Sequence, residues 1–414
     1  MARFTPLPES PFQAGRRLNA RELVDREVEV RDVLTTLLHA RTLFVIGPRR
    51  HGKTSILHVA MQEAEAQRAV VLAVDAEAFP TVDQLAAHLL AEATRRLEPR
   101  VQRAQEAVSR FFGRLRPTVT FNPADQSMSA SLGVDAAAAG GALPLLIDVL
   151  NGIEQWAAQT PRPVAVVIDE VQELLERESE RAERQFRAAV QQHEHVGYVF
   201  AGSRTHYLAR LTQEPGAPFF NLGARLYVGA VPDADFRAFL TDAFARGGFA
   251  VTAEAITALL DLAERVPYNV QLLADACWRA LATQGPTLGP GADAADADGP
   301  ARAARPWGAD DVRATVDAMV RTLDPLYSPQ WTQLTGPQRA ALQAFVYEGA
   351  AGLTSQAVLR RYRVGGASSM QRALGALEEK GVLFADAAGG HAHPRLQDPF
   401  FGRWVRTFVV APGG

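Results

Sequence analysis

Nine consecutive residues combine glycine, lysine and hydroxyl side chains at the spacing that holds a nucleoside triphosphate. They are Gly47, Pro48, Arg49, Arg50, His51, Gly52, Lys53, Thr54 and Ser55. In such a loop the glycines let backbone N–H groups turn toward the phosphates, and the lysine ammonium reaches the β and γ phosphates. The threonine hydroxyl ligates Mg²⁺. The motif therefore predicts that ATP and Mg²⁺ bind here; a chance glycine turn is the alternative.

Lysine is scarce in this chain, which makes Lys53 stand out. Only Lys53 and Lys380 among the 43 basic side chains are lysines. Arginine substitutes poorly in a phosphate loop, because its planar guanidinium is too wide for the space between the terminal phosphates. The retained lysine supports the phosphate-binding interpretation.

Two acidic residues follow an apolar run and could supply the chemistry of hydrolysis. The run Val164–Ile168 predicts a buried strand, and Asp169 and Glu170 come directly after it. Ligands bind at the carboxyl edge of parallel sheets, where these side chains would lie. Asp169 would hold the Mg²⁺ shell together with Thr54, and Glu170 would orient and deprotonate the attacking water. An ordinary solvated strand end is the alternative.

A further strand, predicted at Tyr198–Ala201, also ends in polar residues. A polar side chain there would lie between the tips of the first and third strands. Ser203 would sense the γ-phosphate or the attacking water, and Arg204 would contact phosphate. A turn that carries a surface arginine is the alternative.

The composition excludes several classes of protein. The 414 residues exceed one ordinary core and favour two or three domains, and the net charge of −3 leaves room only for local contact with nucleic acid. Cys277 is the sole cysteine, which excludes a disulfide framework. The pairs His193/His195 and His391/His393 have no third metal ligand nearby in the sequence. No apolar run has the length of a signal peptide or membrane span, which predicts a cytoplasmic protein without membrane contact.

Five short apolar runs predict the sheet that would position the polar residues. They are Thr42–Ile46, Val70–Asp75, Val164–Ile168, Tyr198–Ala201 and the weaker Leu226–Val228. Helical patterns separate these runs, which is typical of a parallel sheet covered on both faces. The predicted fold class is therefore α/β, with a doubly wound P-loop core. Residues 116–133 alternate like a hairpin, and we assign them no chemical role.

Changes in composition divide the chain into four predicted domains. These are a phosphate-binding α/β core at 1–230, a helical lid at 231–284, a flexible Gly/Pro/Ala/Asp-rich linker at 285–306 and a C-terminal domain at 307–414.

The C-terminal domain has the pattern of a winged helix. Residues 353–362 and 367–380 predict a helix-turn-helix, and 382–385 with 391–395 complete a wing. The basic residues that could contact DNA phosphates are Arg360, Arg361, Arg363, Arg372, Lys380 and Arg395. The second helix would present Ser368, Ser369, Gln371 and Arg372 at its start. Glu378 and Glu379 oppose this basic face, so an arm that packs on the core or on a partner protein is the alternative.

Together these motifs resemble the archaeal-type ATPase family, a prokaryotic branch of AAA+ proteins near the origin-recognition ATPases and the STAND signalling NTPases. The similar segments are residues 24–29, the phosphate loop, 167–170, 201–204, 218–225, 334–339 and 398–404. The resemblance covers most of the chain. It implies an AAA+-like core, a helical lid that closes over the nucleotide, and a winged-helix domain.

The resemblance also implies roles for further residues. Val24, Asp25 and Arg26 would lie against the adenine base. Pro267 falls where the family has a Gly-x-Pro that closes the lid, although Arg265 occupies the glycine position. Arg225 would act as an arginine finger in trans if the protein forms rings.

These observations leave three functions open. The first is an ATP-hydrolysing, AAA+-like switch whose nucleotide state, ATP or ADP, controls the winged helix and acts on duplex DNA. The second is a STAND-like signalling or defence scaffold, in which nucleotide controls oligomerisation or a partner protein without DNA. The third is a nucleotide-gated transcription regulator. A kinase is disfavoured, because Glu170 suits water better than a substrate hydroxyl.

Overall fold

The computed structural model describes residues 8–20, 22–97, 118–122, 127–131, 145–284, 305–386 and 393–409. The chain divides into two compact units. Residues 17–230 form one, and residues 1–16 join 231–414 in the other. The four-domain division expected from the sequence stays a prediction, and residues 285–304 of its linker lie outside the described residues.

A parallel five-stranded sheet forms the centre of unit 17–230, which confirms the predicted fold class. Its strands are β1 (Thr42–Ile46), β2 (Val70–Asp75), β5 (Val164–Asp169), β6 (Val196–Gly202) and β7 (Ala224–Tyr227). Their spatial order is β2-β5-β6-β1-β7. The weak fifth strand was expected at 226–228 and begins two residues earlier. Consecutive residues alternate between the two faces of a strand, and both faces of β1 are buried.

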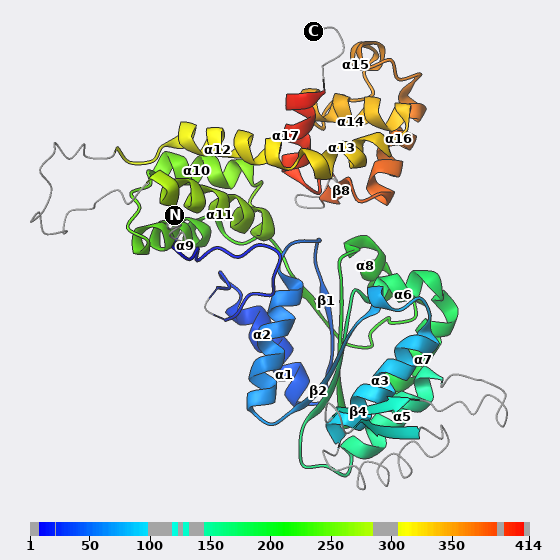
Figure 1. Cartoon of the computed structure of the whole chain (residues 1–414). Helices are drawn as coiled ribbons and strands as arrows, with labels where there is room; N and C mark the ends of the chain where they lie inside the picture. Colours follow the sequence, from blue (N-terminus) through cyan, green and yellow to red (C-terminus); the bar gives the residue numbers. More distant parts are fainter. Residues whose placement is uncertain are drawn as a thin grey trace, which may run out of the picture. The chain divides into compact units, whose positions relative to one another are not determined.

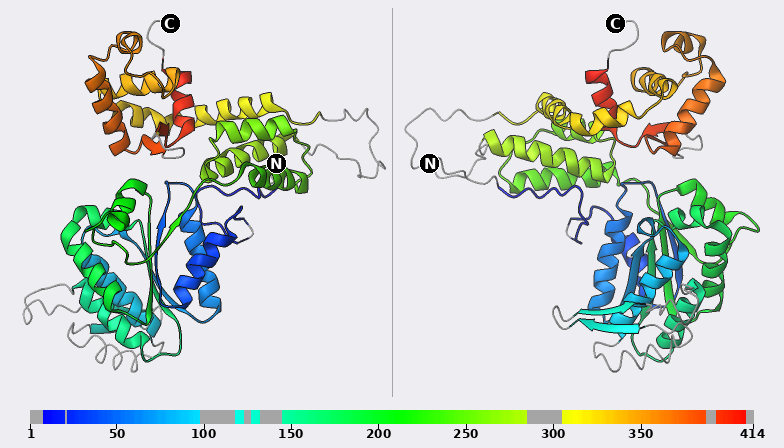
Figure 2. Two further views of the ribbon diagram at one scale, coloured as in Figure 1. Left: turned by 180° about the vertical axis from the view of Figure 1, so that it is seen from behind. Right: turned by 45° about the vertical axis from the view of Figure 1, so that its right-hand side comes forward.

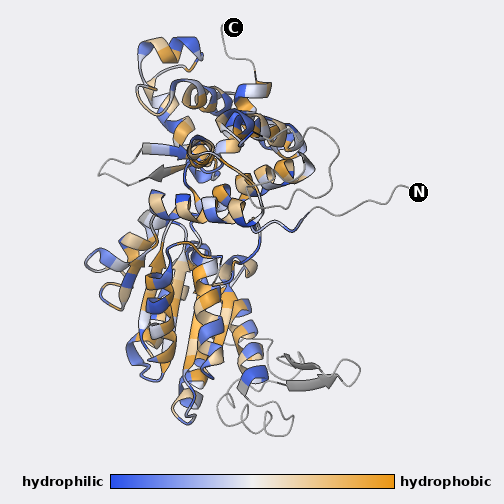
Figure 3. Cartoon of the chain, turned by 90° about the vertical axis from the view of Figure 1, so that its left-hand side faces the viewer, coloured by the Kyte–Doolittle hydropathy of each residue, from blue (hydrophilic) through white to orange (hydrophobic). Residues whose placement is uncertain are grey.

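Helices cover both faces of this sheet (Figures 1 and 2). One face carries α1 (Glu27–Leu38) and α2 (Lys53–Ala66), which pack on Leu43 and Val45 of β1. The other face, with Phe44 and Ile46, carries α3 (Val82–Leu97), α5 (Leu146–Ala157), α6 (Val171–Arg177), α7 (Ser179–Gln192) and α8 (Thr205–Gln213). The short helix η1 (Ala76–Ala78) follows β2. The strands are the most apolar elements of this unit, as expected when both faces are buried (Figure 3).

The hairpin predicted between the second and third runs is present. β3 (Thr118–Asn122) pairs antiparallel with β4 (Ser127–Ser131). Most of the remaining insertion lies outside the described residues.

The other unit is helical. A three-helix segment, α9 (Asp233–Arg246), α10 (Ala253–Leu262) and α11 (Pro267–Gln284), is followed by α12 (Ala309–Thr322). The C-terminal elements are α13 (Asp324–Thr332), α14 (Gly336–Glu348), α15 (Gln356–Arg361), α16 (Ala367–Glu379), the β8–β9 wing (Leu383–Asp386, His393–Leu396) and α17 (Pro399–Phe408). Helix α12 packs against α10 and α11 and also against α17. It therefore joins the three-helix segment to the winged helix.

Residues 8–16 complete the core of the three-helix segment. Phe12 is 2% exposed and lies against the rings of Phe239, Phe244 and Trp278. The Trp278 indole donates to Pro8 O at 3.2 Å. The sequence did not predict this docking, which is a finding of the structure.

Candidate active site

The phosphate loop connects β1 to α2, as the sequence predicted, and its two glycines are required for different reasons. Gly52 precedes α2 with φ 91°, a left-handed conformation that side chains disfavour. At Gly47 a Cβ atom would lie 2.6 Å from Val228 O, so any side chain would collide with the segment after β7. The start of α2, with its positive dipole end, therefore follows directly from the loop, and such a helix start favours anions.

Lys53 lies inside this loop. Its side chain is 4% exposed, and Nζ donates to Gly47 O at 2.9 Å and Pro48 O at 3.1 Å. Burial lowers the pKa of the Lys53 ammonium, while the negative charges of Glu170 and Asp169 oppose that shift. A cation is thus held against backbone carbonyls at the centre of the loop.

Thr54 and Asp169 meet across the tips of α2 and β5. Thr54 Oγ1 donates to Asp169 Oδ2 at 2.9 Å. Burial and the charge of Glu170 raise the pKa of Asp169, against the hydrogen bond from Thr54 and the charge of Lys53. Both side chains line a hollow of about 100 Å³, together with Asp75 and Arg17. The oxygen donors and the crowding of carboxylates fit a Mg²⁺ ion, which prefers such ligands and keeps several waters.

Glu170 and Ser203 also come together. Glu170 precedes α6 with φ 48°, a left-handed conformation that is uncommon for a side-chain-bearing residue. Its Oε2 accepts hydrogen bonds from Ser203 Oγ at 2.8 Å and Ser203 N at 3.2 Å. The sheet order places β6 between β5 and β1, which explains why the two strand ends meet.

Sequence reasoning missed a third member of this cluster, Gln172. Its Nε2 donates to the same Glu170 Oε2 at 2.6 Å. Burial would raise the pKa of Glu170, but the charge of Lys53 and the hydrogen bonds from Gln172 and Ser203 outweigh it, and the net pKa is lowered. The only sequence signal for this contact was a glutamine in the first turn of α6, beside the apolar Val171 and Leu174.

The site therefore has a buried ammonium, a hydroxyl–carboxylate pair and a charged carboxylate, all at the carboxyl edge of a parallel sheet. The sequence profile of the family described as Novel STAND NTPase 1 matches residues 15–287. The chain belongs to this family. A second profile, of a probable winged helix domain, matches residues 325–407 of this STAND NTPase.

Two solved structures show the same fold. A Walker-type ATPase of Pyrococcus abyssi is 15% identical with a TM-score of 0.55, covering 96% of this chain and 99% of the other. The ORC2 protein of Aeropyrum pernix, in ADPNP–ADP complexes, is 13% identical with a TM-score of 0.50, covering 93% and 95%. No curated protein sequence matches the chain significantly. The expected resemblance to AAA+- and STAND-related ATPases with a C-terminal winged helix is thus confirmed.

The arginines predicted near the phosphates bond to other protein groups in this STAND NTPase. Arg204 Nη1 lies 2.8 Å from Glu176 Oε2, with the arginine side chain 52% exposed. Arg225 Nη1 donates to Thr212 O at 2.7 Å, and Arg49 Nη2 lies 3.6 Å from Glu77 Oε2. The loop residue Arg50 has φ 67°. The roles of Arg204 in phosphate contact and of Arg225 as an arginine finger stay predictions.

The segment expected against the adenine base is anchored by Arg26. The Arg26 side chain is 5% exposed; Nη2 donates to Gly229 O at 2.6 Å and Nη1 to Glu29 Oε1 at 2.8 Å. These contacts tie the start of α1 to the segment after β7. Asp25 adopts a left-handed conformation, φ 48°, and Val24 is half-buried. Adenine contact by these residues stays a prediction.

Pro267 belongs to the other compact unit, where it begins α11. Arg265, at the glycine position of the family pattern, has φ 56°, the left-handed conformation for which glycine is best suited. Its Nε lies 2.9 Å from Asp233 Oδ1 and its Nη2 lies 2.8 Å from Asp261 Oδ1. Contact of Pro267 with nucleotide stays a prediction.

Four of the six basic residues predicted for DNA contact in the winged helix already bond to protein groups. Arg372 does so within its own helix, donating from Nε to Ser368 O and from Nη2 to Ser369 Oγ, both at 3.4 Å. Arg361 Nη1 lies 3.0 Å from Glu348 Oε1, and Arg395 Nε lies 3.7 Å from Glu264 Oε2. Lys380 Nζ donates to Gln338 Oε1 at 3.1 Å and to Gln333 O at 3.3 Å. The basic face predicted for DNA contact is therefore partly engaged in bonds within the protein, and contact with DNA stays a prediction.

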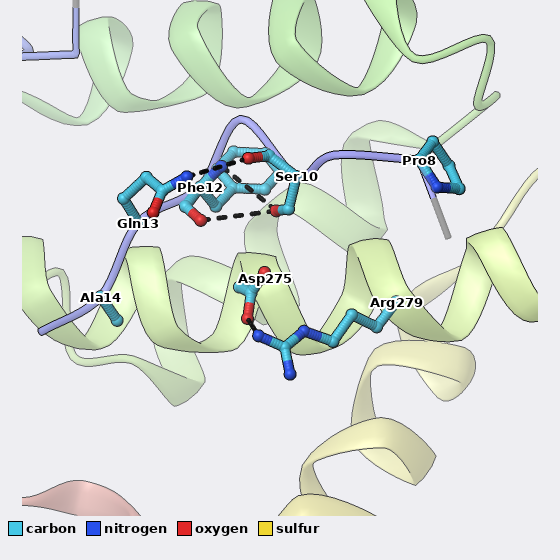
Figure 4. Close-up of a pocket in the computed structure, with 7 residues that line it drawn as sticks. All are labelled: Pro8, Ser10, Phe12, Gln13, Ala14, Asp275 and Arg279. Atoms are coloured by element: carbon cyan, nitrogen blue, oxygen red, sulfur yellow. Dashed lines mark hydrogen bonds and ion pairs between the residues drawn. The ribbon is translucent and has the colours of Figure 1, made fainter. Parts of the chain in front are cut away.

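Other hollows and clusters lie away from the phosphate loop. A hollow of about 460 Å³ in the helical unit is lined by the Asp275–Arg279 ion pair of α11 and by Pro8, Ser10, Phe12, Gln13 and Ala14 (Figure 4). Among the described residues no group of three metal-ligating side chains occurs, and His195 pairs with Glu154 instead. His391 lies outside the described residues. No helix in the described part of the chain is long and apolar enough to span a bilayer.

Proposed function

We propose that this chain binds Mg²⁺-ATP and hydrolyses it as a nucleotide-controlled switch. The observation that carries the proposal is the convergence of Lys53, Thr54, Asp169 and Glu170 at the tips of α2 and β5. Thr54 and Asp169 share a hydrogen bond of 2.9 Å, and Glu170 is joined to Ser203 at 2.8 Å. These are the parts that positioning and charge stabilisation of phosphoryl transfer require.

Each side chain has a separate task in this proposal. Lys53 exchanges its bonds to Gly47 O and Pro48 O for the β and γ phosphates. Thr54 and Asp169 would hold Mg²⁺, which would neutralise the negative charge that develops on the phosphates. Glu170, whose pKa is lowered by the charge of Lys53 and the hydrogen bonds from Gln172 and Ser203, orients the attacking water and accepts its proton. Ser203 links this base to the γ-phosphate position.

The test compares ATP turnover of the wild type with Glu170→Gln. We expect the variant to bind ATP with wild-type affinity and to lose at least about 100-fold in turnover, since a general base contributes that much or more. Glu173→Gln is the matched control. It lies on the same helix, where it pairs at the surface with Arg177, and we expect normal turnover. Turnover by Glu170→Gln at the wild-type rate would reject the assignment of the base.

We further propose that nucleotide state is transmitted to the winged helix through α12. Packing of α12 on both the three-helix segment and α17 supports this route. In this proposal ATP stabilises one arrangement of the switch, and hydrolysis releases it toward self-association or a partner protein. The measurement is the mass in solution of Glu170→Gln with ATP and with ADP. A mass that is the same in both would count against nucleotide-controlled assembly.

Duplex DNA is the second candidate for the output. The observation in its favour is the exposure of Ser368, Gln371 and Arg372 at the start of α16. Binding to duplex DNA at several salt concentrations tests it, because phosphate contacts make affinity fall steeply with salt. Arg372→Ala should weaken such binding, whereas Arg313→Ala, at an exposed arginine of α12 paired with Asp310, should not. Absence of salt-sensitive binding would leave assembly as the output.

A further inference from the structure

Gln172 places its side-chain amide between the two polar residues at the strand ends. It is the second residue of α6 and is 1% exposed. Its Nε2 lies 2.6 Å from Glu170 Oε2 and 3.3 Å from Ser203 Oγ. One buried amide thus contacts both the candidate base and the candidate sensor.

The orientation of this amide is determined by its neighbours. Turning it over would place Oε1 against the Glu170 carboxylate, and two acceptors cannot share a hydrogen bond. In the observed orientation Oε1 points toward Gly202, the last residue of β6. A Cβ atom there would lie 2.1 Å from Gln172 Oε1, so glycine makes the space for the amide.

Packing does not account for a glutamine at this position. Gln172 Oε1 is buried and has no hydrogen-bond partner among the described protein atoms. Burying a polar atom without a partner destabilises a fold, and an aliphatic side chain of similar size would avoid that cost. What the amide provides, and an aliphatic side chain cannot, is the N–H donated to Glu170.

We infer that Gln172 is a positioning residue for hydrolysis, which holds the Glu170 carboxylate in one orientation beside Ser203. This inference rests on the proposed function. The three donors, Gln172 Nε2, Ser203 Oγ and Ser203 N, all meet Oε2 of Glu170. Oε1 of Glu170 is then the oxygen directed to water. When Ser203 Oγ turns toward the nucleotide, the Gln172 amide keeps Glu170 in place.

The experiment replaces Gln172 by methionine and by glutamate and measures single-turnover ATP hydrolysis, ATP affinity and Tm. Gln172→Met removes the donor at similar volume, and we expect hydrolysis to slow by about tenfold to a hundredfold, the scale of a misplaced catalytic group. ATP affinity should stay within about twofold, because Gln172 contacts no loop residue that would bind phosphate. The Tm should be unchanged or higher. Gln172→Glu should be slower still, since two carboxylates would meet.

Gln191→Met, an exposed glutamine on α7, is the control and should hydrolyse ATP normally. Two outcomes would overturn the inference. One is wild-type hydrolysis by Gln172→Met. The other is a parallel loss of hydrolysis, ATP affinity and Tm, which would indicate a purely structural role.

Wild type and Glu170→Gln belong in the same series, so that the two proposals fail separately. If the wild type does not turn over ATP, the proposed hydrolysis is rejected, but the contact between Gln172 and Glu170 is not. The contact is then read from the NMR resonance of the Gln172 side-chain amide, assigned by its loss in Gln172→Met. We expect this resonance to shift strongly in Glu170→Gln. An unchanged resonance would overturn the positioning role whether or not the wild type hydrolyses ATP.

Discussion

The phosphate loop and the winged helix both carry charged residues that the sequence marked as candidates, but the two regions use charge in opposite ways. Lys53 is buried, and its ammonium interacts with the negative charges of Glu170 and Asp169 in the same site. Arg361, Lys380 and Arg395 are exposed, and each is engaged by an acidic or polar group of its own unit.

The difference shows what a residue type can establish without a structure. A buried charge is tolerated only where neighbouring groups compensate it. A motif that buries a lysine therefore requires polar or acidic groups beside that lysine. An exposed arginine can pair with any nearby carboxylate at almost no cost. Counting basic residues therefore does not reveal which of them already bond to protein groups, whereas the loop motif and the acidic residues predicted beside it lie together in the structure.

The largest loss of ATP affinity is expected from substitution of Lys53, and Lys380 serves as the control. Lys53→Ala removes the buried cation of the loop, and we expect ATP affinity to fall by at least about 100-fold, as for loss of a central charged contact. Lys380→Ala removes a surface cation that donates to Gln333 O and Gln338 Oε1, and ATP affinity should stay within about twofold. Calorimetric titration with ATP measures both. Equal losses in the two variants would contradict the contrast.

The phosphate loop and the segment after β7 should also differ in their tolerance of a methyl group. Gly47→Ala forces a Cβ atom against Val228 O, and we expect about 1–3 kcal/mol of destabilisation, typical of overpacking. A Cβ atom at Gly229 would meet nothing within 4 Å, so Gly229→Ala is the control and should change stability little. Urea denaturation compares them. A tolerant Gly47 would mean that the loop and the segment after β7 move apart easily.

Removing Mg²⁺ should weaken ATP binding only in proteins that retain Asp169. In the wild type, withdrawal of Mg²⁺ by EDTA should weaken ATP binding by roughly tenfold, because phosphate charge is no longer neutralised. Asp169→Asn should bind ATP weakly with or without Mg²⁺. Asp83→Asn, a surface residue paired with Arg181, should respond to EDTA like the wild type. Full Mg²⁺ dependence in Asp169→Asn would remove Asp169 from the metal site.

The smallest effect is expected in the winged helix. Arg361→Ala breaks an exposed ion pair with Glu348, and we expect at most about 1 kcal/mol of destabilisation. The loss should shrink further at high salt, because solvent ions screen surface charges. Thermal denaturation at two salt concentrations checks this. A larger, salt-independent loss would mean that this pair is structural.

Local spacing predicted the phosphate loop, Asp169–Glu170, Ser203 and four of the strands, since each depends on residues that are neighbours in sequence. The sequence could not predict the Gln172 amide as a ligand of Glu170, because that contact depends on how β6 ends beside α6. Nor could it predict that Arg26 bonds to Gly229 O, because the two residues are 203 positions apart in the sequence. Arg361 and Glu348 are 13 residues apart on different helices, so no helical periodicity reveals their pairing.

The docking of residues 8–16 also has a consequence for synthesis of the chain. Gln13 N donates to Gln271 Oε1, across 258 positions, and Phe12 fills the aromatic core near Trp278. During translation residues 8–16 emerge well before α9–α11, yet their binding partner is complete only after α11 has left the ribosome. The helical unit must therefore assemble late around a segment made early, while the sheet-containing unit, continuous from 17 to 230, can fold in between.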